Sequence, residues 1–240
     1  MTTKLRAFLS DSHKSGSREY ILTTRLVHDL TVAAAERGYD LLVYLPTVDS
    51  DGFDVIVDDR DRLVPIQLKS IVKGGKVSQW KIRRKLIRPE PEFAELYGFE
   101  SSPNGVGRAG GVILTTVVAA GEAKVDVWYA YTDVDVLSAM WQEILPLSAP
   151  QKRRLQRLRA ELTAEPGGSV ALPRSAFLRA ASPEHLLALC GLQSRVDLPW
   201  RLQLRNLLGQ LYLRRTSPVP VDALRVNIRR HLECLSRAVD

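Results

Sequence analysis

Cysteine and histidine are scarce in this chain of 240 residues. The two cysteines, Cys190 and Cys234, each lie inside a helical pattern, and the four histidines are scattered along the sequence. Zinc sites need cysteine and histidine side chains at short, regular spacings, so the sequence gives no indication of a zinc site. Two separate thiols are typical of a protein from a reducing compartment.

A long apolar segment is also missing. The longest apolar run, from Val112 to Ala120, is far shorter than the roughly 20 residues that a helix needs to cross a bilayer. The first residues, Met1 to Arg6, contain no apolar signal segment. We therefore expect a cytoplasmic protein with no membrane partner. Its composition, 45% hydrophobic and 25% charged, is ordinary for a globular protein of one large or two small domains.

Several common functional motifs are absent, and one is matched by residue type but not by its structural context. Residues 105–110 read Gly-x-Gly-x-x-Gly, but this run precedes a predicted strand and opens no helix, so it lacks the helix N-terminus that binds a dinucleotide phosphate. We expect a loop there. The chain has no Walker A lysine motif and no Gly-x-Ser-x-Gly nucleophile turn. The aspartates between residues 49 and 61 do not have EF-hand spacing, and most of them suit turns.

The pattern that is present begins with one long helix. Residues 17–37 have helical periodicity, with Ser17 as the expected N-cap and Gly38 as the stop. The expected buried stripe consists of Leu22, Leu26, Leu30 and Ala33. Glu19 lies seven residues before Leu26, which places it on or near the inward edge of that stripe. An acid there either serves a site or simply favours the positive end of the helix dipole.

The most informative stretch follows this helix and a short strand at residues 41–45. Residues 54–57 and 63–70 read as two strands, because β-branched and apolar residues dominate them, and the charged run 58–62 suits a hairpin turn. Side chains alternate along a strand, so Gln67 and Lys69 share a face, and a simple register brings Asp54 to the same face. This predicts a carboxylate, an amide oxygen and an ammonium group in one site. The alternative is an ordinary charged surface hairpin.

The rest of the first part alternates between strands and helices. We expect an extended segment at 77–88, a loop at 99–111 that is rich in glycine and serine, a doubly buried strand at 111–120, a strand at 125–131 and a helix through Trp141. The order of these elements predicts an α/β domain, with helices around a mixed central β-sheet.

The motif Asp54…Gln67-Leu68-Lys69, together with the helix that carries Glu19, resembles the PD-(D/E)XK nuclease superfamily. The similarity is greatest to the Mrr-like branch, in which Gln replaces the second acid, and it covers roughly residues 15–135. Phe53 stands where the superfamily name has Pro. The resemblance implies a restriction-endonuclease-like core of helix, mixed sheet and helix. It also implies a metal-dependent DNA endonuclease that acts in restriction, anti-phage defence or DNA processing.

The same resemblance implies the roles of the site residues. A Mg²⁺ or Mn²⁺ ion would be held by Asp54, by the amide oxygen of Gln67, by the backbone carbonyl of Leu68 and by Glu19. Lys69 would position the attacking water or stabilise negative charge on the phosphorus. Because Gln67 is neutral, we expect weaker metal binding than a second acid would give. The alternatives are a catalytically degenerate nuclease fold that binds nucleic acid, and an interaction subunit of a defence complex.

Positive charge is concentrated in two places. No acid lies between Lys69 and Pro89, whereas this interval holds the expected nucleic-acid-binding residues Lys73, Lys76, Lys81, Arg83, Arg84 and Lys85. The alternative, with no role in binding, is a solvated edge strand rich in lysine and arginine. Residues 151–240 hold 16 lysines and arginines against 7 acids, whereas residues 1–150 hold 18 against 20.

This asymmetry divides the expected nuclease domain, residues 1–148, from an Arg-rich helical module, residues 149–240. The module is expected to contain helices at 151–162, from Ser182, at 199–215 and at 221–239, with Ser182 as a helix cap. It would serve DNA contact, dimerisation or partner binding, although basic helix faces are often only solvated. The expected partners are DNA, a second copy of the chain, and a separate recognition or ATPase subunit.

Overall fold

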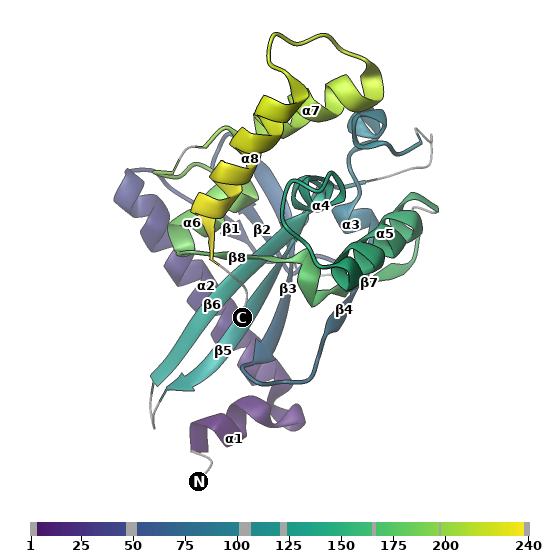
Figure 1. Ribbon diagram of the computed structural model, residues 1–240. Helices are drawn as coiled ribbons and strands as arrows, with labels where there is room; N and C mark the ends of the chain where they lie inside the picture. The colour runs from purple at the N-terminus through teal and green to yellow at the C-terminus, as the bar shows by residue number, and fades with distance from the viewer. Residues whose placement is uncertain are drawn as a thin grey trace.

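The computed structural model describes residues 4–46, 52–100, 107–120, 124–164, 167–196 and 198–237 (Figure 1). The α-helices in it are α1 (Lys4–Ser10), α2 (Ser15–Arg37), α3 (Arg84–Ile87), α4 (Val134–Trp141), α5 (Ala149–Ala164), α6 (Pro183–Cys190), α7 (Trp200–Leu213) and α8 (Val221–Leu235). The strands are β1 (Leu42–Tyr44), β2 (Val55–Asp58), β3 (Leu63–Val72), β4 (Gln79–Arg83), β5 (Gly111–Ala120), β6 (Lys124–Asp133), β7 (Ser169–Pro173), β8 (Leu178–Ala180) and β9 (Ser236–Arg237). Short 3-10 turns span Ser12–Lys14, Pro91–Phe93, Glu95–Tyr97 and Arg174–Ala176.

A mixed sheet forms the centre of the molecule, as the sequence predicts. Its strand order is β1-β2-β3-β5-β6-β8-β9. Strand β3 runs parallel to β5, and the other neighbouring pairs are antiparallel. Helix α2 covers one face of this sheet, and α4, α5, α7 and α8 gather near its upper end in Figure 1. The architecture is therefore α/β, with helices flanking a mixed sheet.

The predicted hairpin is present as β2 and β3. Val55 and Val57 are buried on one side of β2, and Val55 pairs with Ile66. The turn is stabilised by Asp59, which is buried and whose carboxylate accepts hydrogen bonds from the backbone N–H groups of Asp61 and Arg62. An aspartate that bonds to the backbone two and three residues ahead favours a tight turn. The charged run 58–62 thus forms the hairpin because one of its acids binds the turn backbone.

Helix α2 agrees with the sequence prediction except at its start. Its buried residues include Leu22, Leu26, Leu30 and Ala33, and Gly38 ends it in the left-handed conformation with φ +86°. The helix begins at Ser15, so the prediction of Ser17 as N-cap was wrong. Lys14 occupies that position, and it makes no capping hydrogen bond with its side chain. The helix is therefore held by its buried stripe and its glycine end.

The segment after β3 also differs from the prediction. Residues 77–88 were expected to be extended throughout, but only β4 is a strand, and the chain then turns into the short helix α3. Residues 107–110 lead into β5 without opening a helix, as expected, and residues 101–106 of the predicted loop lie outside the described part of the chain. Strand β5 is central, with Val112, Ile113 and Leu114 buried between β3 and β6.

The C-terminal part does not consist only of helices, so that prediction was wrong. Strand β7 pairs with β4, and β8 and β9 extend the central sheet beyond β6. These strands are only two to five residues long, and their partners lie far away in the sequence. The helices were predicted better. Ser182 caps α6 by accepting a hydrogen bond from the N–H of His185, and Leu224, Ile228, Leu232 and Leu235 form the buried face of α8.

A buried ion cluster fastens this C-terminal part to the sheet. Arg201 on α7 pairs with Asp133, at 2.6 Å, and with Asp135. The side chains of the two aspartates are 1% and 2% exposed, and that of Arg201 is 11% exposed. One continuous apolar core includes buried residues from both sides of position 148. Residues 149–237 therefore pack onto the sheet. Within the described residues, no helix is long and apolar enough to span a membrane.

Candidate active site

A pocket of about 390 Å³ opens between α2, the hairpin and β4. The residues of the predicted site that line it are Glu19, Asp54, Leu68 and Lys69, and its further lining residues are Arg18, Leu22, Thr23, Ser70, Trp80 and Thr115. Four of the five predicted site residues, which come from three separate segments of the chain, thus surround one space.

Asp54 is placed by the backbone of the neighbouring strand. Its N–H donates to the carbonyl oxygen of Ile66 at 2.9 Å, which continues the β2–β3 pairing by one residue. Its carboxylate accepts a hydrogen bond of 2.6 Å from the N–H of Leu68. A backbone donor to an ionised carboxylate is strong and fixes its orientation. Asp54 is exposed toward the pocket while its position is fixed from both sides of the hairpin.

Gln67 is the predicted residue that does not line this pocket. It is 8% exposed, and its amide oxygen is buried with no hydrogen-bond partner among the described residues. A buried polar atom without a partner costs about 1–3 kcal/mol, so such atoms are rare in folded proteins. Because side chains alternate along β3, Gln67 and Lys69 lie on the same face of the strand. The amide oxygen of Gln67 accepts no hydrogen bond within the described residues and belongs to the residue before the pocket-lining Leu68. Such a buried oxygen is suited to bind a cation.

The pocket lies where β3 extends beyond the residues that pair with β2. Pairing between these strands begins with Val55 opposite Ile66, whereas β3 continues through Lys69 to Val72 with β5 as its partner. From Gln67 onward, β3 therefore has no paired strand on its hairpin side in the described chain, and the Leu68 N–H binds the Asp54 carboxylate there. Leu68 and Lys69 both line the pocket at this open edge, although they point to opposite faces of the strand.

Helix α2 contributes two neighbouring charges. Glu19 is exposed to solvent and lines the pocket, so it lies at the margin of the buried stripe and not within it. Arg18 also lines the pocket, and its guanidinium donates to the carbonyl oxygen of Leu9 at 2.8 Å. Sequence reasoning missed Arg18. Its position beside Glu19 was the signal that could have indicated it.

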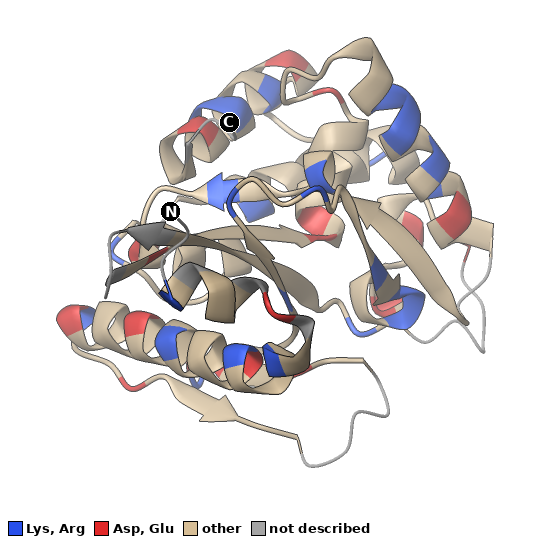
Figure 2. Ribbon diagram, turned by 90° about the horizontal axis from the view of Figure 1, so that it is seen from below, with Lys and Arg blue, Asp and Glu red and all other residues tan. Residues whose placement is uncertain are grey.

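The predicted basic residues do not line the pocket, and they differ in exposure. Lys73, Lys76, Lys81 and Arg83 are exposed, whereas Arg84 and Lys85 on α3 are half-buried. Arg83 packs against Gly52, which has φ +83° and has no room for a Cβ atom beside that side chain. Trp80 of the same strand lines the pocket. Strand β4 thus forms one wall of the site. In Figure 2, by contrast, acidic and basic residues alternate along α2.

The acids that line the pocket are Glu19 and Asp54. Among the described residues, no group of three or more histidine, cysteine, aspartate or glutamate side chains could hold a metal ion. A cation bound here would therefore depend on amide and backbone oxygens in addition to carboxylates. Oxygen ligands of this kind are the ones that Mg²⁺ prefers, together with several waters.

The chain matches no model of a known protein family and no curated protein. Its function must therefore be inferred from the residues of the site.

Proposed function

We propose that this protein is a metal-dependent DNA endonuclease of the PD-(D/E)XK superfamily, in its Mrr-like branch with a Gln-x-Lys motif. The observation that carries the proposal is the single pocket that Glu19, Asp54, Leu68 and Lys69 line, with the unpartnered amide oxygen of Gln67 on the adjacent strand position. The order of helix α2, strands β2 and β3, and the parallel strand β5 supports a restriction-endonuclease-like core.

Each residue has a role that its chemistry allows. Asp54, Gln67 and the carbonyl oxygen of Leu68 would hold a Mg²⁺ or Mn²⁺ ion, with Glu19 as a further acid at the pocket margin. The bound ion would supply an activated water and offset negative charge on the phosphate. Lys69, half-buried in the same pocket, would orient the water or donate a hydrogen bond to a phosphate oxygen. Arg18 provides a second cation for the phosphate.

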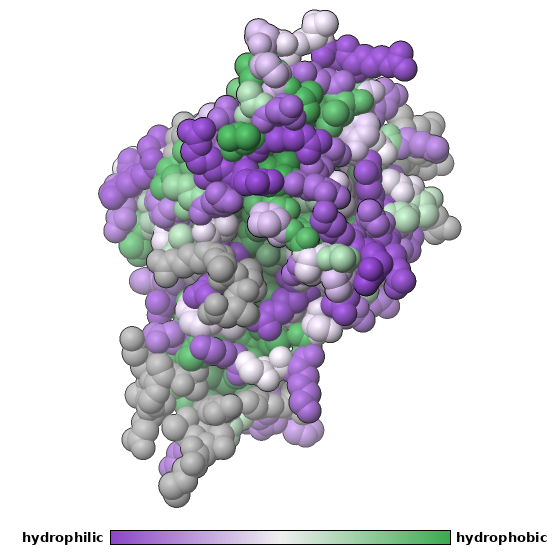
Figure 3. Space-filling model, viewed as in Figure 1, coloured by the Kyte–Doolittle hydropathy of each residue, from purple (hydrophilic) through white to green (hydrophobic). Residues whose placement is uncertain are grey.

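The surroundings of the pocket suit a polyanionic substrate. Strand β4, whose Trp80 lines the pocket, and the connection before it expose Lys73, Lys76, Lys81 and Arg83 to solvent, and Arg84 and Lys85 follow directly. The Arg-rich helix α5 lies next to β7, the partner of β4. Hydrophilic residues dominate the right-hand side of Figure 3, where α5 lies. Cleavage of both strands needs two such sites, so we also propose that the protein acts as a homodimer, with any recognition or ATPase function in a separate subunit.

The first test is cleavage of supercoiled plasmid in Mg²⁺, in Mn²⁺ and in EDTA, with Lys69→Ala beside the parent. Loss of a positioned proton donor or acceptor lowers rates about 10²- to 10⁴-fold, so the variant should leave the plasmid intact. A control is Arg37→Ala, which removes an exposed arginine at the end of α2, outside the residues that line the pocket. This control should cut the plasmid like the parent.

Other outcomes would redirect the proposal. Cleavage that persists in Lys69→Ala would mean that the pocket is not the active site. A parent that binds DNA in a salt-dependent manner without cutting it would be a degenerate nuclease fold. A parent that neither cuts nor binds DNA would favour an interaction subunit of a defence complex.

A further inference from the structure

The pairing of the central strands places Lys69 and Arg179 in one row across the sheet. Lys69 pairs with Leu114, Leu114 pairs with Ala130, and Ala130 pairs with Arg179. Directly paired residues point to the same face of a sheet, and neighbouring strands lie about 4.8 Å apart. The two cations therefore stand on one face, about 14 Å apart along this row. Arg179 is 110 positions further along the chain, so no local pattern connects it with the site.

Trp128 lies in the neighbouring row and binds two cations. It pairs with Thr116, two positions from Leu114 on the same strand face. The guanidinium carbon of Arg179 lies 3.9 Å from the centre of the Trp128 ring, and the ammonium nitrogen of Lys73 lies 4.8 Å from it. These are cation–π distances. The ring of Trp128 thereby holds a cation from β8 and a cation from the end of β3 over the same part of the sheet.

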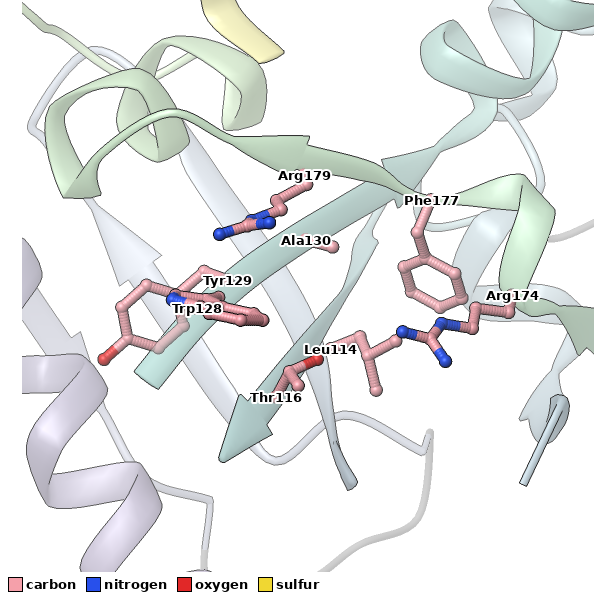
Figure 4. Close-up of a pocket in the computed structure, with 8 residues that line it drawn as sticks. All are labelled: Leu114, Thr116, Trp128, Tyr129, Ala130, Arg174, Phe177 and Arg179. Carbon is pink, nitrogen blue, oxygen red and sulfur yellow. The ribbon is translucent and has the colours of Figure 1, made fainter. Parts of the chain in front are cut away.

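A small hollow separates this group from a third cation, Arg174. Leu114, Thr116 and Ala130 are among its lining residues, and Arg174, Phe177 and Arg179 lie around it (Figure 4). Its volume of about 30 Å³ accommodates one or two water molecules and excludes a nucleobase. Among the described residues, this part of the sheet therefore offers cations to small anionic groups.

One aromatic contact joins a wall of the hollow to a wall of the candidate active site. The ring of Phe177, beside the hollow, meets the ring of Trp80 edge to face, with ring centres 5.6 Å apart. Trp80 in turn lines the pocket that contains Lys69. In Figure 1, α2 lies behind the sheet, and no helix lies in front of the lower halves of β5 and β6. Asp126, two residues before Trp128, is an acid on this face of β6.

We propose that Lys73, Trp128, Arg174 and Arg179, here called the Trp128 patch, bind the phosphate backbone of nucleic acid that continues across the sheet from the cleavage site. The inference rests on the proposed function for its ligand. Two of these cations, Arg174 and Arg179, line a hollow that is too small for a base, and the third, Lys73, lies over the Trp128 ring that also lines it. Contacts of this kind position a strand without reading its sequence.

The test measures binding separately from cleavage. Fluorescence anisotropy of a labelled duplex in EDTA gives the dissociation constant and its dependence on salt, with no metal present. The variant Arg174→Gln/Arg179→Gln should bind about tenfold more weakly or worse at moderate salt. The slope of log affinity against log salt should fall by about 2, since each phosphate contact contributes about 0.9. Lys73→Gln alone should lower that slope by about 1.

A matched control is Arg37→Gln, which removes an exposed arginine at the end of α2, on the other side of the sheet. It should keep the parental slope. Because Arg179 stacks on Trp128, the single variants Arg174→Gln and Arg179→Lys are measured too, with thermal melting as a check of folding. Arg179→Lys keeps the charge and should keep most of the slope.

The results separate this inference from the proposed function. A parent that cuts DNA while folded patch variants bind it with parental affinity and slope would overturn the inference alone. A parent that cuts nothing, but whose binding depends on the patch in this manner, would support the inference and contradict the proposed function. A parent that fails to bind the duplex even at low salt would overturn both.

Discussion

The backbone N–H of Leu68 donates a hydrogen bond of 2.6 Å to the carboxylate of Asp54. The contact joins the two strands of the hairpin at the point where their pairing ends. It holds the carboxylate beside the edge of β3 that carries Gln67 and Lys69, and its donor is a backbone group that every substitution except proline keeps. Asp54 is therefore oriented before any ligand binds, which is a requirement for a precise site.

Asp54→Asn should remove the negative charge of the side chain while keeping its position. The asparagine oxygen can still accept the hydrogen bond from Leu68, so the variant should melt near the parental temperature. Loss of the charged metal ligand should lower the cleavage rate on the order of 100-fold or more, equivalent to at least about 2.7 kcal/mol. Initial rates on plasmid in saturating Mg²⁺ and a melting curve measure the two effects. A variant that cuts at the parental rate would exclude Asp54 from the reaction.

Gln67→Glu should change the response to metal. A carboxylate binds Mg²⁺ more tightly than an amide does, so half-maximal cleavage should need less Mg²⁺. Without metal, the buried charge has no partner and should lower the melting temperature, and Mg²⁺ should restore it. Melting curves in EDTA and in Mg²⁺ test this. An unchanged Mg²⁺ dependence of both cleavage and melting would argue that Gln67 holds no metal.

Gln67→Met is the matched comparison at the same position. Methionine has a similar volume and removes the unpartnered buried oxygen, so the variant should be as stable as the parent or more stable in EDTA. It should also lose the stabilisation by Mg²⁺ and the cleavage activity. Cleavage at the parental rate in this variant would contradict the role of the amide oxygen.

Arg201→Met should destabilise the whole fold. Arg201 pairs with Asp133 and Asp135, and these charges raise the pKa of the guanidinium above its ordinary value despite the opposing effect of burial. Removing one partner leaves two buried carboxylates without their cation, which costs about 3–5 kcal/mol. Urea unfolding measures this loss, and it should appear as one transition, because α7 and the sheet share a core.

The triple variant Arg201→Met/Asp133→Asn/Asp135→Asn is the control. It removes the unpaired charges. The side chain of Asp133 caps α4 by accepting a hydrogen bond from the N–H of Val136, and the oxygen of an asparagine at that position can accept the same bond. The triple variant should therefore recover much of the lost stability. If it were less stable than Arg201→Met, the ion cluster would not be the cause.

Asp29→Asn should make stability less sensitive to acid. Burial of Asp29 opposes ionisation, but hydrogen bonds from Arg25, Tyr129 and His28 outweigh it and hold the pKa of the carboxyl below its ordinary value. A lowered pKa in the folded state contributes stability above the unfolded pKa of about 4, and this stability disappears as the pH falls through the folded pKa.

Melting temperatures measured between about pH 6 and pH 2 therefore test this prediction. The parent should lose stability below about pH 4, and the variant should lose less over the same range. Parallel curves for the two proteins would show that Asp29 makes no such contribution. Tyr129, which donates to Asp29 at 2.8 Å, stays protonated throughout this range, because burial and that hydrogen bond raise its pKa far above 10.

The elements that depend on local chemistry could be predicted from the residues alone. Helix α2 follows from the spacing of Leu22, Leu26 and Leu30 and from its glycine stop, and β5 follows from an unbroken β-branched run. The hairpin follows from two apolar strands around a charged turn. Since a strand alternates its faces, even the shared face of Gln67 and Lys69 could be predicted before any contact was known.

The features that depend on distant partners could be seen only in the folded chain. The small strands β7, β8 and β9 have too few residues to show a period, and they form because β4 and β6 provide edges for them. The place of Arg18 in the pocket, the unpartnered oxygen of Gln67 and the row from Lys69 to Arg179 all depend on strand register. Register is set by the packing of the whole sheet, and for that reason no local pattern in the sequence contains it.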